Sequence, residues 1–172
     1  LFGMTDFSGF LTKKIPIHAV LGDSHAALFG QGCVREGGIK ATYGTGSSVM
    51  LNTGKKIITS QKGLVTSLAW SMDGEVNYVL EGNINYTGAV ISWLKDDLQL
   101  ILSPMETEAL ARGANPSDRT YLVPAFTGLG APYWDSDAKG LITGMSRVTG
   151  KKELVRAALD SIVYQISDIV RL

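Results

Sequence analysis

Residues 37–54, GGIKATYGTGSSVMLNTG, decide the fold. Two short runs, Ile39 to Tyr43 and Ser48 to Asn52, are separated by a tight glycine turn, a pattern typical of a β-hairpin. Glycines permit positive φ and close approach of the backbone, so successive N–H groups of such a turn can point at one anion. The stretch therefore predicts a sheet and, at its turn, a candidate phosphate site.

The turn carries Gly44, Thr45 and Gly46, followed by Ser47 and Ser48. The hydroxyls of Thr45 and Ser47 add donors to those of the backbone. No lysine follows the glycines, so the segment matches neither the Walker pattern nor the Rossmann fingerprint. A glycine turn in a hairpin is more often only a turn, and both interpretations stay open on the residues alone.

Working outward, further strands and helices flank this hairpin. Asp73-Gly74 is a strong hairpin signal and lies between predicted strands at 65–72 and 76–80. We also expect strands at 15–20, 121–125 and 140–145, and helices at 25–30, 87–98, 106–112 and 150–172. Antiparallel strands followed by helices on a mixed sheet predict an α/β or α+β architecture.

The last predicted helix has a strongly amphipathic pattern. Its apolar residues repeat at helical spacing: Leu154, Ala158, Leu159, Ile162, Val163, Ile166, Ile169 and Val170. No Gly or polar cap ends the pattern, and the chain opens on Leu1. We expect the sequence to be a piece of a longer protein.

Composition excludes several classes of partner. The 172 residues contain 16 basic and 16 acidic side chains, so no charge surplus favours nucleic acid or an anionic membrane. Cys33 is the single cysteine, which excludes an intramolecular disulfide and suits a reducing cytoplasm. No apolar run approaches the roughly 18 residues needed to cross a bilayer.

Asp23 is the first candidate for chemistry, because a carboxylate at a strand end near a phosphate-binding turn could take a proton from an attacking hydroxyl. The competing interpretation, favoured on the residues alone, is that Asp23 caps the following helix. Gly88 could expose N–H groups to an anion at a helix start, or simply begin the helix. His18 and His25 have no partner at metal-ligand spacing and are expected to be structural.

The loop at 127–135, TGLGAPYWD, is rich in turn formers and aromatics. It has the composition of a binding loop. Anchoring of a long loop by buried aromatic side chains is an equally good interpretation.

Three blocks together resemble the FGGY family of carbohydrate kinases. They are GDSHAALFGQG at 22–32, KATYGTGSSVMLNTG at 40–54, and AFTGLGAPYWDSDAKGLITGMSRVTGKKELVRAALDSIVYQ at 125–165. The resemblance covers nearly the whole chain. It implies an α/β fold of the ribonuclease H-like (actin-like ATPase) type, with a mixed β-sheet flanked by helices and incomplete at both ends.

The resemblance also implies a role for individual residues. Asp23 would be the general base that deprotonates the acceptor hydroxyl. Thr45, with Gly44 and Gly46, would hold the phosphates of ATP. Gly88 would contact the nucleotide, and Ser92 stands where glycerol-specific members usually have Gln. The family uses Mg²⁺ with ATP and closes two domains around a sugar or polyol.

Two positions depart from the glycerol-specific members. Ser24 replaces a usual Gln, and Ser48 replaces a usual Phe. Both family positions contact the acceptor, so two smaller side chains predict a larger pocket and a pentulose or other polyol as substrate. A glycerol kinase is the alternative.

The same resemblance divides the chain. Residues 1–32 would be the C-terminal tail of a sugar-binding domain, and residues 33–172 an incomplete ATP-side domain. We expect this piece to be inactive by itself, and the complete enzyme is compatible with a homodimer. A non-catalytic actin-like binding module and another actin-like enzyme, such as an acetate kinase, are the remaining hypotheses.

Overall fold

The chain is built around a four-stranded antiparallel sheet. The computed structural model describes residues 3–4 and 15–172, so the predicted tail at 1–32 lies partly outside the described residues. The strands are β3 (Ile39–Tyr43), β4 (Ser47–Gly54), β5 (Val65–Met72) and β6 (Glu75–Ile84), in the spatial order β3-β4-β6-β5. Both predicted hairpins are confirmed. All pairs of strands in the described residues are antiparallel.

The remaining elements are short except for the last helix. They are β1 (Gly3–Met4), β2 (Pro16–Ile17), α1 (Asp23–Gly30), α2 (Gly88–Ser92), η1 (Trp93–Asp97), α3 (Glu106–Arg112), β7 (Tyr121–Val123), β8 (Leu141–Thr143) and α4 (Lys151–Val170). Strands β7 and β8 pair with each other, as do β1 and β2.

Two predicted elements differ from the structure. The strand expected at 15–20 comprises only Pro16–Ile17 in the described residues, where Pro16 pairs with Met4 and Ile17 with Gly3. The helix expected at 87–98 is α-helical only to Ser92 and continues as a π-helix, in which the N–H of Leu98 donates to the Trp93 carbonyl at 3.0 Å.

The two faces of the central sheet pack against different helices. Successive residues of a strand point to opposite faces, so Val49 and Met50 of β4 belong to different cores. One face packs against α1 in a cluster of Leu28, Met50, Ala69, Trp70 and Val79. The other packs against α4 in a cluster of Val49, Ile84, Ala131 and Ile169. The sheet is therefore sandwiched between α1 and the C-terminal end of α4.

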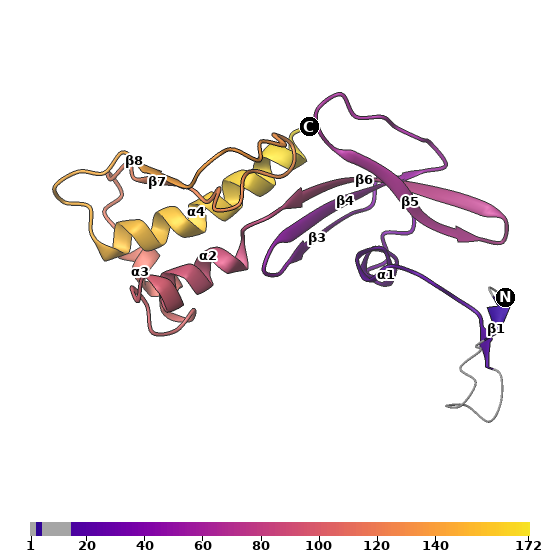
Figure 1. Cartoon of the computed structure of the whole chain (residues 1–172), viewed down its shortest axis with the longest axis horizontal. Helices are drawn as coiled ribbons and strands as arrows, with labels where there is room; N and C mark the ends of the chain where they lie inside the picture. Colours follow the sequence, from indigo (N-terminus) through magenta and orange to yellow (C-terminus); the bar gives the residue numbers. More distant parts are fainter. Residues whose placement is uncertain (1–2, 5–14) are drawn as a thin grey trace.

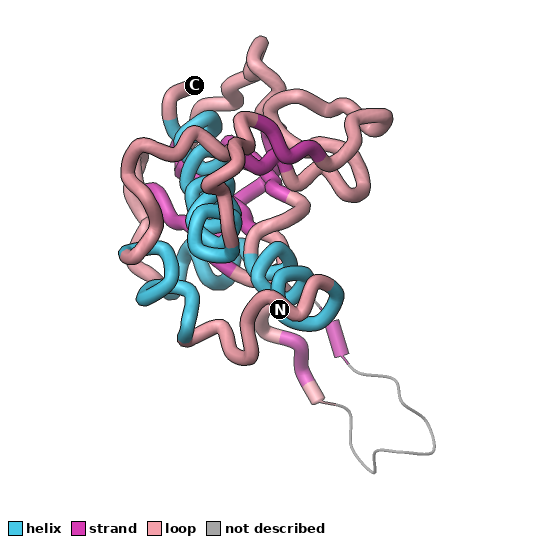
Figure 2. Tube along the Cα trace, turned by 90° about the vertical axis from the view of Figure 1, so that its left-hand side faces the viewer, coloured by secondary structure: helices cyan, strands magenta, loops and turns pink. Residues whose placement is uncertain are grey.

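A third core lies beyond the sheet, toward α3 and the N-terminal end of α4. Its buried members are Val90, Leu94, Ile101, Leu122, Val155, Ala157 and Ala158. Figure 1 shows that α2 and α3 run beside α4 in this half of the molecule, while the sheet and α1 form the other half. In the perpendicular view of Figure 2, the long helix α4 crosses in front of the strands.

The inner face of α4 matches the predicted one only in part. Ala158 and Ile169 are buried as expected, whereas Val163 and Val170 are 62% and 57% exposed. Other residues of α4 that the pattern did not include are buried as well: Glu153, Val155, Ala157 and Ser161. Arg156 and Asp160 lie one turn apart on the outer side, with 4.0 Å between their charged atoms.

Glu153 fixes the start of α4. Its Oε2 accepts the N–H of Gly150 and its Oε1 accepts the N–H of Asn115, both at 2.9 Å. These backbone donors lower the pKa of the Glu153 carboxyl below its ordinary value of 4.5. The side chain is 8% exposed, so the ionised carboxylate ties the helix start to the loop after α3.

We expect Glu153→Gln to lower the melting temperature at pH 7, because an amide supplies one acceptor oxygen where two N–H groups now bind. A carboxyl with a lowered folded-state pKa stabilises the fold above its unfolded-state pKa, and this stability is lost as the pH falls through the folded-state value. The difference between variant and wild type should therefore shrink below pH 4.5. Glu108→Gln, in an exposed pair with Arg112, is the control. A difference independent of pH down to acid unfolding would contradict this role.

Candidate functional site

The glycine turn between β3 and β4 packs directly on the start of α2. The N–H groups of Gly88 and Ala89 donate to the carbonyls of Gly44 and Thr45, at 2.9 and 3.0 Å. The hydroxyl of Thr87 donates to the Gly44 carbonyl at 3.0 Å and lies 2.8 Å from the hydroxyl of Ser47. The structure thus brings together Gly44–Gly46 and Gly88, two of the regions that the sequence nominated separately.

Glycine is required at both sides of this contact. A Cβ at Gly88 would lie 2.4 Å from the Gly44 carbonyl oxygen, and a Cβ at Gly46 would lie 2.5 Å from that of Ile84. Any side chain at either position would push the turn away from α2 and β6. The glycines therefore serve close packing of backbone on backbone.

The turn keeps its own donors free. In the part of the chain that the structure describes, no protein acceptor binds the N–H of Thr45, the N–H of Gly46 or the Thr45 hydroxyl. Thr45 is exposed at the tip of the hairpin. Such a set of neighbouring donors suits an anion such as a phosphate.

The prediction that α2 offers its N-terminal N–H groups to an anion is wrong for Gly88 and Ala89. Both are already bound to carbonyls of the turn. The start of α2 therefore supports the anion-binding turn and does not form a second anion site with these groups.

Asp23 begins α1, where its side chain is exposed. The N-cap is Gly22, with no side-chain capping bond, so the prediction that Asp23 caps the helix is wrong by one position. Its Oδ1 accepts the N–H of Ser24 at 2.7 Å, and its Oδ2 has no hydrogen-bond partner among the described residues. One oxygen is held and the other is available as a proton acceptor.

The sheet face beneath α1 carries two polar rows next to the glycine turn. In the row nearest the turn, Thr42, Ser48 and Asn83 lie opposite one another on β3, β4 and β6. In the next row, Lys40 and Glu81 flank Met50. We call Lys40, Thr42, Ser48, Glu81 and Asn83 the polar layer.

Lys40 is the charged centre of the polar layer. It is 2% exposed, and its Nζ donates to the Thr42 hydroxyl at 2.6 Å. Burial lowers the pKa of the Lys40 ammonium, while electrostatic interaction, mainly with Glu81, acts in the opposite direction. Asp23 also interacts electrostatically with Lys40, which agrees with the packing of α1 on this face.

The three serines predicted to bind substrates occupy different surroundings. Ser48 is 9% exposed and its hydroxyl donates to Glu81 Oε1 at 3.0 Å. Ser24 is half-buried beside Asp23. Ser92 ends α2, one turn after Gly88, and is exposed with no hydrogen-bond partner for its side chain among residues 15–172.

The sequence did not identify Lys40, Glu81 or Thr87. A lysine in the middle of a predicted strand was the available signal for Lys40. For Thr87, the signal was a hydroxyl directly before a helix-initiating glycine. Glu81 had no local signal, because its partner Ser48 is 33 residues away in the sequence.

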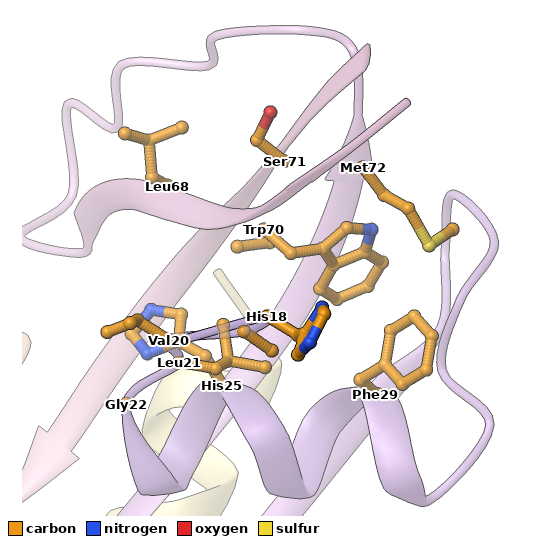
Figure 3. Close-up of a pocket in the computed structure, with 12 residues that line it drawn as sticks. His18, Val20, Leu21, Gly22, His25, Phe29, Leu68, Trp70, Ser71 and Met72 are labelled. Carbon is orange, nitrogen blue, oxygen red and sulfur yellow. The ribbon is translucent and has the colours of Figure 1, made fainter. Parts of the chain in front are cut away.

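A pocket of about 700 Å³ lies beside this region, between α1 and β5. Figure 3 shows Phe29 of α1 and Trp70 of β5 meeting across it, with their rings edge to face and 5.2 Å between the centroids. His18 and His25 also line it, and His25 Nε2 lies 3.3 Å from the Ser67 hydroxyl. Neither Asp23 nor the glycine turn lines this largely apolar pocket, so it is separate from the candidate site.

The loop at 127–135 is hydrogen-bonded to two distant segments of the chain. The indole of Trp134 donates to the Gly63 carbonyl at 2.6 Å, and the hydroxyl of Tyr133 donates to Asp168 at 2.8 Å. Both rings remain more than half exposed, so the interpretation of buried aromatic anchors is wrong. Hydrogen bonds, more than burial, connect this loop to the segment before β5 and to α4.

The described residues contain neither a cluster of metal ligands nor a membrane-spanning helix. Within the described residues, no group of three or more His, Cys, Asp and Glu side chains could hold a metal ion. The helices of residues 15–172 are too short or too polar to cross a bilayer.

Comparison with known proteins gives one consistent result. Residues 39–172 match the C-terminal domain of the FGGY family of carbohydrate kinases. Glycerol kinase 1 of Thermotoga maritima is 55% identical over 98% of this chain, which covers 34% of that protein. This chain thus spans about a third of the length of this relative.

Solved structures confirm the fold class. Plasmodium falciparum glycerol kinase with ADP matches 87% of this chain with a TM-score of 0.79 and 38% identity, and the match covers 30% of that protein. The xylulose kinase of Lactobacillus acidophilus matches 86% with a TM-score of 0.73 at 22% identity, covering 30% of that chain. The α/β kinase fold expected from the sequence is therefore confirmed.

We expect Gly88→Ala to destabilise the protein by about 1–3 kcal/mol, the usual range for overpacking, because its Cβ would clash with the Gly44 carbonyl. Urea unfolding measures the loss. Gly30→Ala is the matched control, since a Cβ at this helical glycine meets nothing within 4 Å and should be neutral or stabilising. Equal stability of the two variants would show that the contact between turn and α2 is loose.

Proposed function

The chain belongs to the FGGY family of carbohydrate kinases, and we propose that the complete protein transfers the γ-phosphate of ATP to a hydroxyl of glycerol. The observation that carries this proposal is the junction of the glycine turn with Gly88, next to the sheet face on which α1, the helix that begins with Asp23, packs. Phosphoryl transfer needs positioning and charge stabilisation more than covalent chemistry. A turn with free donors and a carboxylate on one face meet these two needs.

Glycerol is supported better than the pentulose that the two serines predict. The glycerol kinase of Thermotoga maritima is 55% identical, whereas the xylulose kinase structure of Lactobacillus acidophilus is 22% identical. The argument from Ser48 is also weaker than its small size suggests. Its hydroxyl is buried and already bonded to Glu81, so the serine adds no unpaired donor to an acceptor pocket.

We propose that Asp23 acts as the general base. Asp23 Oδ2 accepts the proton of the acceptor hydroxyl while that oxygen bonds to the γ-phosphorus and ADP leaves. The N–H of Ser24 fixes the other carboxylate oxygen and so orients the base. The exposure of Asp23 leaves it accessible to an acceptor.

We propose that the turn holds the phosphates of ATP. Thr45 and Gly46 donate their free N–H groups, and the Thr45 hydroxyl adds a third donor. Ser92, one turn beyond Gly88, would contact the nucleotide on the exposed side of α2. Mg²⁺ in such kinases is commonly held by one or two carboxylates and the substrate phosphates, where it neutralises developing charge.

The division of the chain follows from this proposal. Residues 1–32 would end the sugar-binding domain, and residues 33–172 would form part of the ATP-side domain. Residues of the remaining two thirds of the relatives' length would complete the site. A homodimer of the complete protein is compatible with this division.

We expect the complete protein to phosphorylate glycerol with a kcat/KM at least about tenfold above that for xylulose, because a polyol-binding site discriminates by its paired hydroxyls. A coupled assay of ADP release with both acceptors measures the ratio. A preference for xylulose would restore the pentulose hypothesis. Absence of turnover on every polyol tested would favour a non-catalytic module.

We expect Asp23→Asn to lower kcat by about 10²–10⁴-fold, the usual contribution of a general base. ATP affinity, measured by calorimetry, should change little, because the proposed base contacts the acceptor hydroxyl and the turn donors that would hold ATP are unchanged. Asp73→Asn is the control, since Asp73 lies in the β5–β6 turn with a φ of 53° that Asn also adopts readily. Near-normal turnover of Asp23→Asn would remove the base role.

A further inference from the structure

The polar layer contains a carboxylate oxygen that the protein itself does not use. Glu81 Oε1 accepts the Ser48 hydroxyl at 3.0 Å, while Oε2 has no hydrogen-bond partner among the described residues. No buried side-chain nitrogen or oxygen in this part of the chain lacks a partner, so the free Oε2 is accessible to solvent. An accessible carboxylate oxygen beside the buried Lys40 and Ser48 is a ready acceptor for a ligand hydroxyl.

The position of Glu81 places this oxygen within the candidate site. Glu81 lies one row further from the glycine turn than Ser48 and on the same sheet face. This is the sheet face against which α1, whose first residue is Asp23, packs. An acceptor that presents one hydroxyl to Asp23 would lie against this row of the sheet.

Lys40 places a positive charge on the same sheet face as the Glu81 carboxylate. The two side chains flank Met50 in the register of β3, β4 and β6, and the Lys40 ammonium is 2% exposed. A carboxylate that is charge-compensated in this way binds a neutral hydroxyl through a charge-assisted hydrogen bond. The polar layer is thus built for a neutral, hydroxyl-rich ligand, and an anionic ligand would meet the carboxylates of Asp23 and Glu81.

We propose that Glu81 is a specificity-determining residue that binds a second hydroxyl of the acceptor, one that is not phosphorylated. Ser48 holds the carboxylate in place through Oε1, and Oε2 accepts the hydroxyl. This role rests on the proposed kinase function and adds to it the residue that distinguishes a polyol from a simple alcohol.

The test combines a change in the protein with removal of a substrate hydroxyl. The complete protein and its Glu81→Ala and Glu81→Gln variants are assayed with glycerol, 1,2-propanediol and 1,3-propanediol, each diol lacking one hydroxyl of glycerol. Glu81→Ala should lower kcat/KM for glycerol on the order of 10- to 100-fold, mainly through KM. For the diol that lacks the recognised hydroxyl, the loss should stay below about threefold, because the deleted contact no longer exists.

Two controls separate recognition from folding. Glu75→Gln alters an exposed carboxylate on the same strand, and Glu75 pairs with Lys55. This variant should leave kcat/KM unchanged for all three acceptors. Glu81→Gln keeps the size of the side chain and an oxygen for Ser48. The loss of kcat/KM for glycerol should therefore be smaller in Glu81→Gln than in Glu81→Ala.

An equal loss of kcat/KM for all three acceptors in Glu81→Ala would overturn the role of Glu81, because a structural defect does not distinguish substrates by one hydroxyl. An unchanged KM for glycerol in Glu81→Ala would overturn it as well. Absence of wild-type turnover on every polyol would instead reject the proposed function, and this role with it.

Discussion

Two carbonyls of the glycine turn, those of Gly44 and Thr45, accept the first N–H groups of α2, and the rest of the candidate site depends on this contact. The contact is possible because Gly46 and Gly88 have no Cβ where backbone meets backbone. It joins two segments more than 40 residues apart in sequence. With the turn fixed from behind, its remaining donors face outward as a preformed group, which lowers the entropic cost of binding an anion.

The two faces of the central sheet differ in polarity. One face packs against α4 through apolar side chains such as Val49 and Ile84. The other is apolar under α1 but becomes polar toward the glycine turn, where Lys40, Ser48 and Glu81 lie. Alternation along β3, β4 and β6 produces both faces from the same strands. The proposed phosphate-binding turn, base and hydroxyl-binding carboxylate can therefore lie near one another without weakening the core on the other side.

Local signals in the sequence predicted much of this architecture. The glycine turn, the Asp73-Gly74 turn and the amphipathic repeat of α4 each depend on residues close in sequence, and all three were found where expected. The contact of Gly88 with the turn and the bond from Ser48 to Glu81 join distant segments, so no periodicity could reveal them. The π-helical turn after Ser92 was likewise not predicted, because the apolar pattern at 87–98 indicated one continuous α-helix. The proposed roles of Asp23 and Thr45 come from the resemblance to a kinase family. The positions of Lys40 and Glu81 beside them became visible only in the structure.

A crystal structure of the complete protein with glycerol and a non-hydrolysable ATP analogue tests the central claim most directly, since that claim is an arrangement in space. The account predicts the terminal phosphate within hydrogen-bond distance of the Thr45 and Gly46 N–H groups. It also predicts one glycerol hydroxyl between that phosphate and Asp23. A terminal phosphate bound away from the turn, or an Asp23 carboxylate directed away from the acceptor in the closed complex, would contradict it.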